Sequence, residues 1–272
     1  MLKIAVIGAG SLLGRELVDT LEPRECSVLP LAHGPMTRDE EFSDLVMFAP
    51  EASLLEGIEL VLLAETPAAP ELLAGYQGRI LDLRAEPEPS LDPMPLAGPW
   101  PKGKLALRVR PALEQVLAAI PRLVEGVGEV AGTHLQSVAH LGDRGVDGLM
   151  EQTAAVFKGE DPDIEKLGYR AAFEVVPQAP RGRMITVQVP AFHGDLMILH
   201  LRAAEGRTLN KLAAPEGVEW RERPASSREV AVSPFLLAHF APVEEGRAGI
   251  LTLAYDPILW GVLMPLLRLL EL

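Results

Sequence analysis

The sequence is poor in cysteine, and this scarcity excludes several classes of protein. Its 272 residues include a single cysteine, Cys26, so no internal disulfide can form. The six histidines are scattered and show no zinc-ligand spacing, so we expect no metal site. A chain without a disulfide framework is typical of a reducing compartment, and we expect a cytoplasmic protein.

The sequence also lacks a long apolar run and an excess of positive charge. The apolar segments 2–13 and 258–272 are shorter than the roughly 20 residues of a membrane-spanning helix, and Pro265 and Arg268 interrupt the second. Lys and Arg number 25 against 38 Asp and Glu, which gives a net charge of −13. Negative charge repels phosphate backbones and anionic lipids. We therefore expect no membrane and no nucleic-acid partner.

A glycine-rich turn joins the first predicted strand, residues 3–7, to the first predicted helix, residues 12–21. Gly8 permits a tight turn, and Gly14 allows the helix to pack closely on the strand. Bare N–H groups at the start of a helix favour a phosphate. The turn therefore predicts a dinucleotide site, although the glycines could equally serve packing alone. The candidate cofactor-binding residues are Gly8, Gly10, Ser11, Leu12, Leu13 and Gly14.

The end of the second predicted strand bears on which cofactor this site would take. Residues 31–34 offer no carboxylate for the ribose hydroxyls of NAD, which argues against NAD. Arg38 could reach the 2′-phosphate of NADP, but acidic residues 39–41 follow it directly. NADP is thus a possible cofactor, and a solvated surface charge is the other interpretation of Arg38.

The hydrophobic content of the chain, 48%, is that of a globular protein. The pattern of predicted strands and helices differs between the first and the second part of the chain. In the first part, strands alternate with helices, which indicates a parallel sheet. The predicted strands are 3–7, 27–32, 58–64 and 79–83, and the predicted helices are 12–21 and 68–75. Residues 86–104 are rich in proline and glycine and predict a surface loop at a domain boundary. The later elements indicate an α+β domain: helices 111–124 and 148–158, with strands 133–139, 186–189, 197–203 and 249–255.

Five segments, in the same order along the chain, resemble motifs of one enzyme family. The segments are Val6-Ile7-Gly8-Ala9-Gly10-Ser11-Leu12-Leu13-Gly14-Arg15-Glu16-Leu17, Ile80-Leu81-Asp82-Leu83-Arg84, Gly145-Val146-Asp147-Gly148-Leu149-Met150-Glu151-Gln152, Ala172-Phe173-Glu174-Val175-Val176-Pro177-Gln178 and Val187-Gln188-Val189-Pro190-Ala191-Phe192-His193-Gly194-Asp195. They are similar to the V-x-G-A-T-G-x-V-G-R-E-L, V-I-D-L-S, G-x-x-E-L-x-x-Q, A-F-N-x-I-P-Q and V-R-V-P-V-x-x-G-H motifs of the aspartate-semialdehyde dehydrogenases. The resemblance implies a Rossmann-type dinucleotide-binding domain with an inserted α+β dimerisation domain.

The residues that this family's reaction needs are missing from the matching positions. The family reduces an acyl phosphate with NADPH through a cysteine thioester, with a histidine to move the proton and an arginine to bind the substrate carboxylate. These three positions fall on Leu113, Asp195 and Gln188. Leucine cannot form a thioester, aspartate repels an anionic substrate, and glutamine cannot pair bidentately with a carboxylate. We therefore assign no catalytic residue.

Other residues of the sequence offer no clear substitute for the missing cysteine, histidine and arginine. Cys26 precedes the second strand, in the first domain, and is typical of a small buried hydrophobic residue. His193 lies two positions before Asp195 but has no nucleophile to activate, and His134 and His140 are typical of satisfied polar residues. A serine mechanism built from Ser137, His193 and Asp195 lacks the G-x-S-x-G turn. The family's N-x-x-K-G-A segment is here Asp256-Pro257-Ile258-Leu259-Trp260-Gly261.

The resemblance leads to a definite expectation for domains and function. Residues 1–110 with 257–272, including a C-terminal helix at 259–270, would form the nucleotide-binding domain, and residues 111–256 the substrate and dimerisation domain. We expect a protein without the thioester-based activity, retained as a binding or regulatory homodimer that pairs through the second domain. Residues 187–189 and 197–201 keep the apolar alternation of such a face. Heterodimers with an active relative, or an active NADP-dependent semialdehyde oxidoreductase with altered chemistry, are the alternatives.

Overall fold

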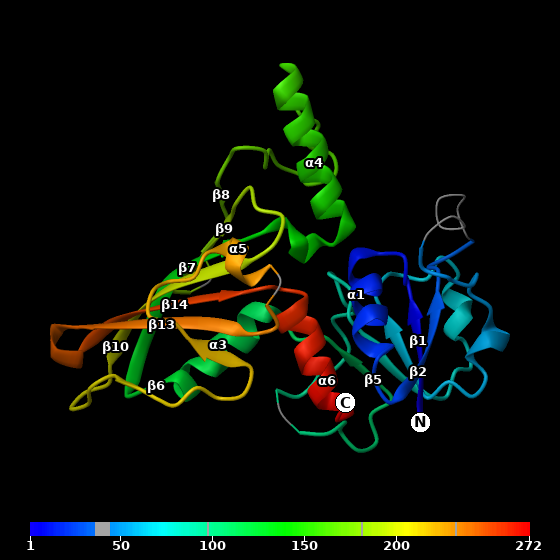
Figure 1. The fold of residues 1–272 in the computed structure, drawn as a ribbon, viewed down its shortest axis with the longest axis horizontal. Coiled ribbons are helices and arrows are strands. Elements are labelled where there is room, and N and C mark those ends of the chain that lie inside the picture. Colours follow the sequence, from blue (N-terminus) through cyan, green and yellow to red (C-terminus); the bar gives the residue numbers. More distant parts are fainter. Residues whose placement is uncertain (36–43, 97, 181, 232) are drawn as a thin grey trace. The chain divides into compact units, whose positions relative to one another are not determined.

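The computed structural model describes residues 1–35, 44–96, 98–180, 182–231 and 233–272. Arg38 and the acidic residues 39–41 therefore lie outside the described residues. The chain forms two compact units: unit 1 is Met1–Arg110 with Pro265–Leu272, and unit 2 is Pro111–Met264. Both units are drawn in Figure 1.

Unit 1 is built on a five-stranded parallel sheet in the order β2-β1-β3-β4-β5. The strands are β1 (Leu2–Ile7), β2 (Cys26–Leu31), β3 (Leu60–Leu63), β4 (Arg79–Asp82) and β5 (Ala106–Arg108). Residues 4–7 and 60–62 are completely buried, as expected for central strands of a parallel sheet covered on both faces. Because β2 lies on one side of β1 and β3 on the other, the strand order reverses beside β1. Ligands of such sheets bind at this point, beyond the carboxyl ends of the strands.

The helix α1 (Leu12–Leu21) begins and ends where the sequence predicts it. Ser11 caps it, and Gly14, Leu17, Val18 and Leu21 form its buried face. The predicted helix at 68–75 is wrong in extent: only the 3₁₀ turn η2 (Pro70–Leu73) forms, like the turn η1 (Ala52–Leu55). Ala74 returns to an extended conformation, which ends the turn, and Leu72 is the residue of η2 that is buried.

Unit 2 contains a mixed seven-stranded sheet in the order β12-β13-β14-β10-β7-β9-β8. Its strands are β7 (Val127–Gln136), β8 (Val176–Pro177), β9 (Met184–Gln188), β10 (Asp195–Ala203), β12 (Val218–Trp220), β13 (Leu236–Val243) and β14 (Ala248–Tyr255), and β6 (Val124–Glu125) pairs with β11 (Asn210–Lys211). β5, β12 and β13 are absent from the predicted strands. The predicted strand 133–139 is wrong at its end, because residues 138–141 form the turn η3 (Val138–Leu141).

Helices cover one face of this sheet and extend from its end. The helix α3 (Ala112–Leu123) packs Val116, Ile120 and Leu123 into the core with the inward side chains of β10 and β14. The helix α4 (Asp143–Lys158) follows η3 and reaches beyond the sheet (Figure 1). The remaining short elements are α5 (Ser227–Val230) and η4 (Glu244–Gly246). The described part of the chain contains no helix of the length and apolarity that crossing a membrane requires.

The units differ from the expected domains at residues 257–264, which belong to unit 2. Trp260 lies in the unit 2 core, and its Nε1 donates to the carbonyl of Gly217 at 3.3 Å. The predicted helix 259–270 is divided into a π-helical turn, η5 (Leu259–Leu263), and α6 (Met264–Leu270). Pro265 has no N–H to donate to the carbonyl of Gly261, four residues earlier. Gln115 Nε2 donates to that carbonyl instead, at 2.7 Å.

The proline-rich stretch 86–104 lies within unit 1, not at its end. The N–H of Met94 donates to the carbonyl of Arg108 at 2.8 Å, and the N–H of Arg108 donates to that of Asp92 at 2.9 Å. These bonds tie the stretch to β5. The division between the units therefore falls after Arg110, later than the composition alone suggests.

Candidate functional site

The glycine turn of unit 1 lies where a dinucleotide site is expected, at the carboxyl end of β1. Gly8 has a φ of 82°, and a Cβ there would come within 2.7 Å of the Cβ of Glu65. A Cβ on Gly14 would overlap the carbonyl oxygen of Gly8 and lie 2.6 Å from the Cα of Ala9. Both glycines are thus required by close packing around the turn, independently of any ligand.

Several polar groups of this turn are used within the protein. The N–H groups of Gly8 and Ala9 both donate to the carbonyl of Leu31 at 2.9 Å. The hydroxyl of Ser11 donates to the carbonyl of Gly8 at 2.7 Å and accepts from the N–H of Gly14 at 3.0 Å. Gly10, Leu12 and Leu13, the other candidates, are partly exposed.

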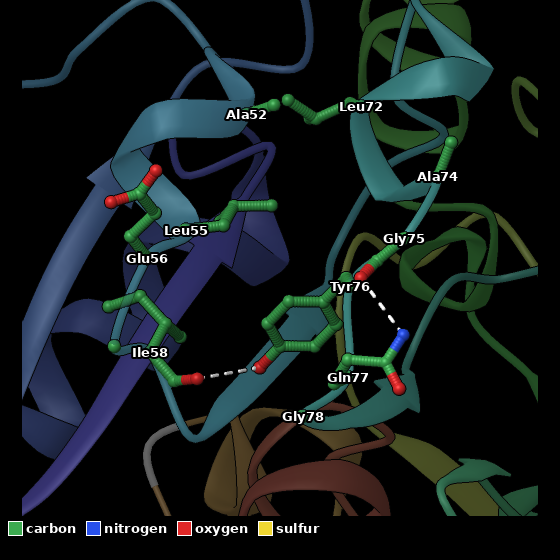
Figure 2. Close-up of a pocket in the computed structure, with 11 residues that line it drawn as sticks. Ala52, Leu55, Glu56, Ile58, Leu72, Ala74, Gly75, Tyr76, Gln77 and Gly78 are labelled. Carbon is green, nitrogen blue, oxygen red and sulfur yellow. Dashed lines mark hydrogen bonds between the residues drawn. The ribbon is translucent and has the colours of Figure 1, made fainter.

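A hollow of about 290 Å³ lies in unit 1 beside Tyr76 (Figure 2). The Tyr76 hydroxyl donates to the carbonyl of Ile58 at 3.2 Å, and burial is the main reason that the pKa of Tyr76 is raised. Gly57 and Ile58 precede β3, and residues 76–78 precede β4, so the hollow lies at the amino ends of the strands. It is therefore not part of the glycine turn, which lies at their carboxyl ends.

In unit 2, Asp195 forms the centre of a buried polar network with groups from three strands and a turn. Asp195 is 1% exposed, and His134 is also buried. Asp195 Oδ1 accepts from the N–H of Ser137 at 2.9 Å and from its hydroxyl at 2.7 Å. His134 Nε2 lies 2.8 Å from Asp195 Oδ2 and 3.1 Å from the Tyr255 hydroxyl. The network joins β7, β10 and β14 at one end of the sheet.

The protonation of this network follows from its partners. A carboxylate only accepts hydrogen bonds, so Nε2 of His134 carries the proton. Nδ1 of His134 has no hydrogen-bond partner among the described residues. Burial, with the Asp195 carboxylate as second cause, raises the pKa of Tyr255 well above its ordinary value, so the phenol stays protonated. Burial lowers the pKa of His140, whose Nδ1 lies 2.6 Å from the Ser137 carbonyl oxygen.

This geometry excludes the serine mechanism considered above. A histidine that activates a serine must lie between the hydroxyl and the carboxylate. Here Asp195 lies between Ser137 and His134, and the Ser137 hydroxyl donates directly to the carboxylate. His193 pairs with Asp256 instead, at 3.3 Å, and Asp256 also accepts from the backbone of residues 258 and 259.

The side chains of Gln188 and Leu113 are both engaged within unit 2. Gln188 is buried, its Nε2 donates to Gln136 Oε1 at 2.7 Å, and its Oε1 accepts from the Tyr169 hydroxyl at 3.3 Å. Leu113 is partly buried and packs against the unit 2 core. Cys26 is buried in unit 1, where its Sγ donates to the carbonyl of Leu21 at 3.2 Å, and burial raises the pKa of its thiol. A raised pKa disfavours the nucleophilic thiolate.

The sequence did not indicate three of the polar pairs that the structure forms. They are His33 with Glu65, Asp82 with Arg84, and Gln136 with Gln188. The sequence did contain a signal for the pair His33–Glu65, because each of these residues follows a strand of the parallel sheet by two positions. Among the described residues, no three His, Cys, Asp or Glu side chains are grouped as metal ligands.

Comparison with solved structures identifies the fold. Aspartate semialdehyde dehydrogenase II from Vibrio cholerae, in complex with ASA, matches with a TM-score of 0.73 and 16% identity over 100% of this chain and 97% of its own. A probable aspartate-semialdehyde dehydrogenase from Pseudomonas aeruginosa matches with 0.71 and 19% over 98% and 97%. The Francisella tularensis enzyme matches with 0.69 and 13% over 100% and 99%. No protein-family model and no curated protein matches the sequence.

The fold predicted from the sequence is thereby confirmed. The chain has the α/β fold of the semialdehyde dehydrogenases, with a Rossmann-type unit and a second α+β unit. At these identities the likeness concerns the fold, and activity has to be argued from the site.

Proposed function

We propose that this chain is an aspartate-semialdehyde dehydrogenase-like protein that has lost the thioester-based reaction and serves as a dimeric binding or regulatory protein. One observation carries the proposal: the position matching the family's nucleophile is Leu113, whose side chain packs against the hydrophobic core of unit 2. The buried, hydrogen-bonded thiol of Cys26 offers no replacement. The polar groups at the two other matching positions, Gln188 and Asp195, are occupied by partners within the protein.

An activity assay tests the loss of the reaction. With aspartate semialdehyde, inorganic phosphate and either NADP or NAD, we expect no reduction of the nicotinamide above that of a blank, because no thiolate is available to form the acyl intermediate. An active aspartate-semialdehyde dehydrogenase in the same assay provides the positive control. A substrate-dependent rate that disappears in Cys26→Ser or another single variant would contradict the proposal. Such a rate would favour an active oxidoreductase with altered chemistry.

The open face of the unit 2 sheet supports the dimer. Along β10, Met197, Leu199 and Leu201 point into the core, so the other face takes the alternate positions 198, 200 and 202, all exposed. Ile198, 39% exposed, lies on the central strand and pairs with Thr133 and Thr252 on its neighbours. These three uncharged side chains form a row across the middle of the sheet. Such a row suits a symmetric contact with the same face of a second copy. The sequence assigned the alternating apolar residues of 197–201 to the dimer face. Met197, Leu199 and Leu201 point into the core of unit 2 instead.

Size measurement tests this contact. We expect light scattering to give the mass of a dimer for the wild type and that of a monomer for Ile198→Glu, because two symmetry-related carboxylates would be buried in the contact. Ile164→Glu, which introduces the same charge at an exposed position outside the sheet, should remain dimeric. A monomeric wild type, or a dimer unaffected by Ile198→Glu, would contradict the contact. Mixing with an active homologue then tests heterodimer formation.

A further inference from the structure

The semialdehyde dehydrogenase fold implies a dinucleotide at the carboxyl end of β1, and the residues present can be tested against it. The β1–α1 turn lies between the loops that leave β2 and β3, since β1 is the strand between those two. In sheets of this kind the cofactor enters between these loops and approaches the turn. The question is whether the loops leave room for it.

The loops after β2 and β3 are in contact with each other. His33, two residues beyond β2, and Glu65, two residues beyond β3, place Nδ1 and Oε2 3.6 Å apart. The N–H of Ala68 donates to the carbonyl of His33 at 2.7 Å. A Cβ on Gly34 would come within 2.7 Å of the Cβ of Ala68, so the two loops are packed together.

Glu65 also lies directly on the turn. Its backbone nitrogen and Cβ are 2.8 and 2.7 Å from the position of a Cβ on Gly8. Its side chain is 39% exposed, and its Cγ lies 2.9 Å from the same position. A pyrophosphate brought to Gly8 would meet a negative charge, and like charges at such short range repel each other.

We infer that the pair His33–Glu65, which joins residues 33–34 after β2 to residues 65–68 after β3, closes the crevice over the glycine turn to dinucleotides. The glycines at positions 8 and 14 serve the packing of strand, turn and helix. The inference concerns unit 1 alone and does not depend on the residue at position 113. It therefore stands or falls separately from the loss of the thioester reaction.

Titration of the whole protein with NADPH, followed by nicotinamide fluorescence, tests the inference. For the wild type we expect no saturation up to about 1 mM, and NADH should behave alike. Glu65→Ala removes the carboxylate and its contact with His33, and should bind NADPH at least about tenfold more tightly than that limit. Glu25→Ala, an exposed carboxylate at the amino end of β2, is the matched control and should behave as the wild type.

Two results would overturn the inference. Saturable binding of NADPH to the wild type below 1 mM would mean that the crevice is open. Failure of a folded Glu65→Ala variant, checked by its unfolding curve, to gain affinity would mean that Glu65 does not close it. Binding to the wild type without any turnover of aspartate semialdehyde would remove this inference and leave the proposed function intact.

Discussion

Replacing Asp195 by alanine should lower the free energy of unfolding of unit 2 by about 3–5 kcal/mol, because it removes the shared acceptor of a buried network. The N–H and hydroxyl of Ser137 and Nε2 of His134 would lose their acceptor together. Ser137 is fully buried and His134 is nearly so. An unpaired buried donor costs much more than an exposed one.

Urea unfolding followed by tryptophan fluorescence measures this effect. Trp220 and Trp260 both belong to unit 2, so a Trp100→Phe background reports that unit alone. Asp161→Ala, an exposed carboxylate of the same unit, should change stability by less than about 0.5 kcal/mol. Asp195→Asn keeps an acceptor for Ser137 and should lie between the two. Equal stabilities of Asp195→Ala and Asp161→Ala would show that the network contributes nothing.

The second large effect is expected at Gly14. Gly14→Ala should destabilise unit 1 by about 3 kcal/mol or more, because the added methyl group overlaps backbone atoms that have no room to move. Those atoms are the carbonyl of Gly8 and the Cα of Ala9. Relief of the overlap would separate α1 from β1 and disturb the Ser11 cap, whose hydroxyl bonds to both Gly8 and Gly14.

The matched control is the same substitution at Gly75. That glycine also lies in unit 1 and has a φ of 84°, but a Cβ there would have no atom within 4 Å. Gly75→Ala should therefore cost only the strain of a left-handed residue, about 1–2 kcal/mol. Trp100 provides the fluorescence signal for unit 1. If Gly14→Ala proved no more costly than Gly75→Ala, the glycine would not be explained by packing.

These expectations change how the glycine turn is understood. Gly8-Ala9-Gly10-Ser11-Leu12-Leu13-Gly14 predicted either a phosphate site or a packed turn, and local sequence could not separate the two. The contacts around it favour packing, because Glu65 and the Gly8 carbonyl occupy the space that side chains on Gly8 and Gly14 would need. The residue that bears most on the question, Glu65, is more than fifty residues away in the sequence and carries no motif.

Local elements were predictable where the physical signal is local. The bounds of α1 follow from apolar residues at helical spacing and a serine cap, and β1 follows from a β-branched run before a glycine. The predicted extents of helices were wrong where tertiary packing determines the local structure. The segment around Leu72 has helical composition but forms one turn, and the helix expected at 259–270 begins as a π-helical turn, Leu259–Leu263, before α6, which contains Pro265. Around Leu72 the apolar contacts override the helix propensity of the segment, and at 259–270 the N–H that Pro265 lacks does so.

By itself, the sequence determined the fold class and the absence of a cysteine at position 113, because these depend on residue type and short-range periodicity. Only the tertiary structure decided the partners of the polar residues. His134 meets Asp195 across 61 residues, and His33 meets Glu65 between loops that leave different strands. Such pairs depend on strand order and register, which the hydrophobic pattern of single segments does not specify.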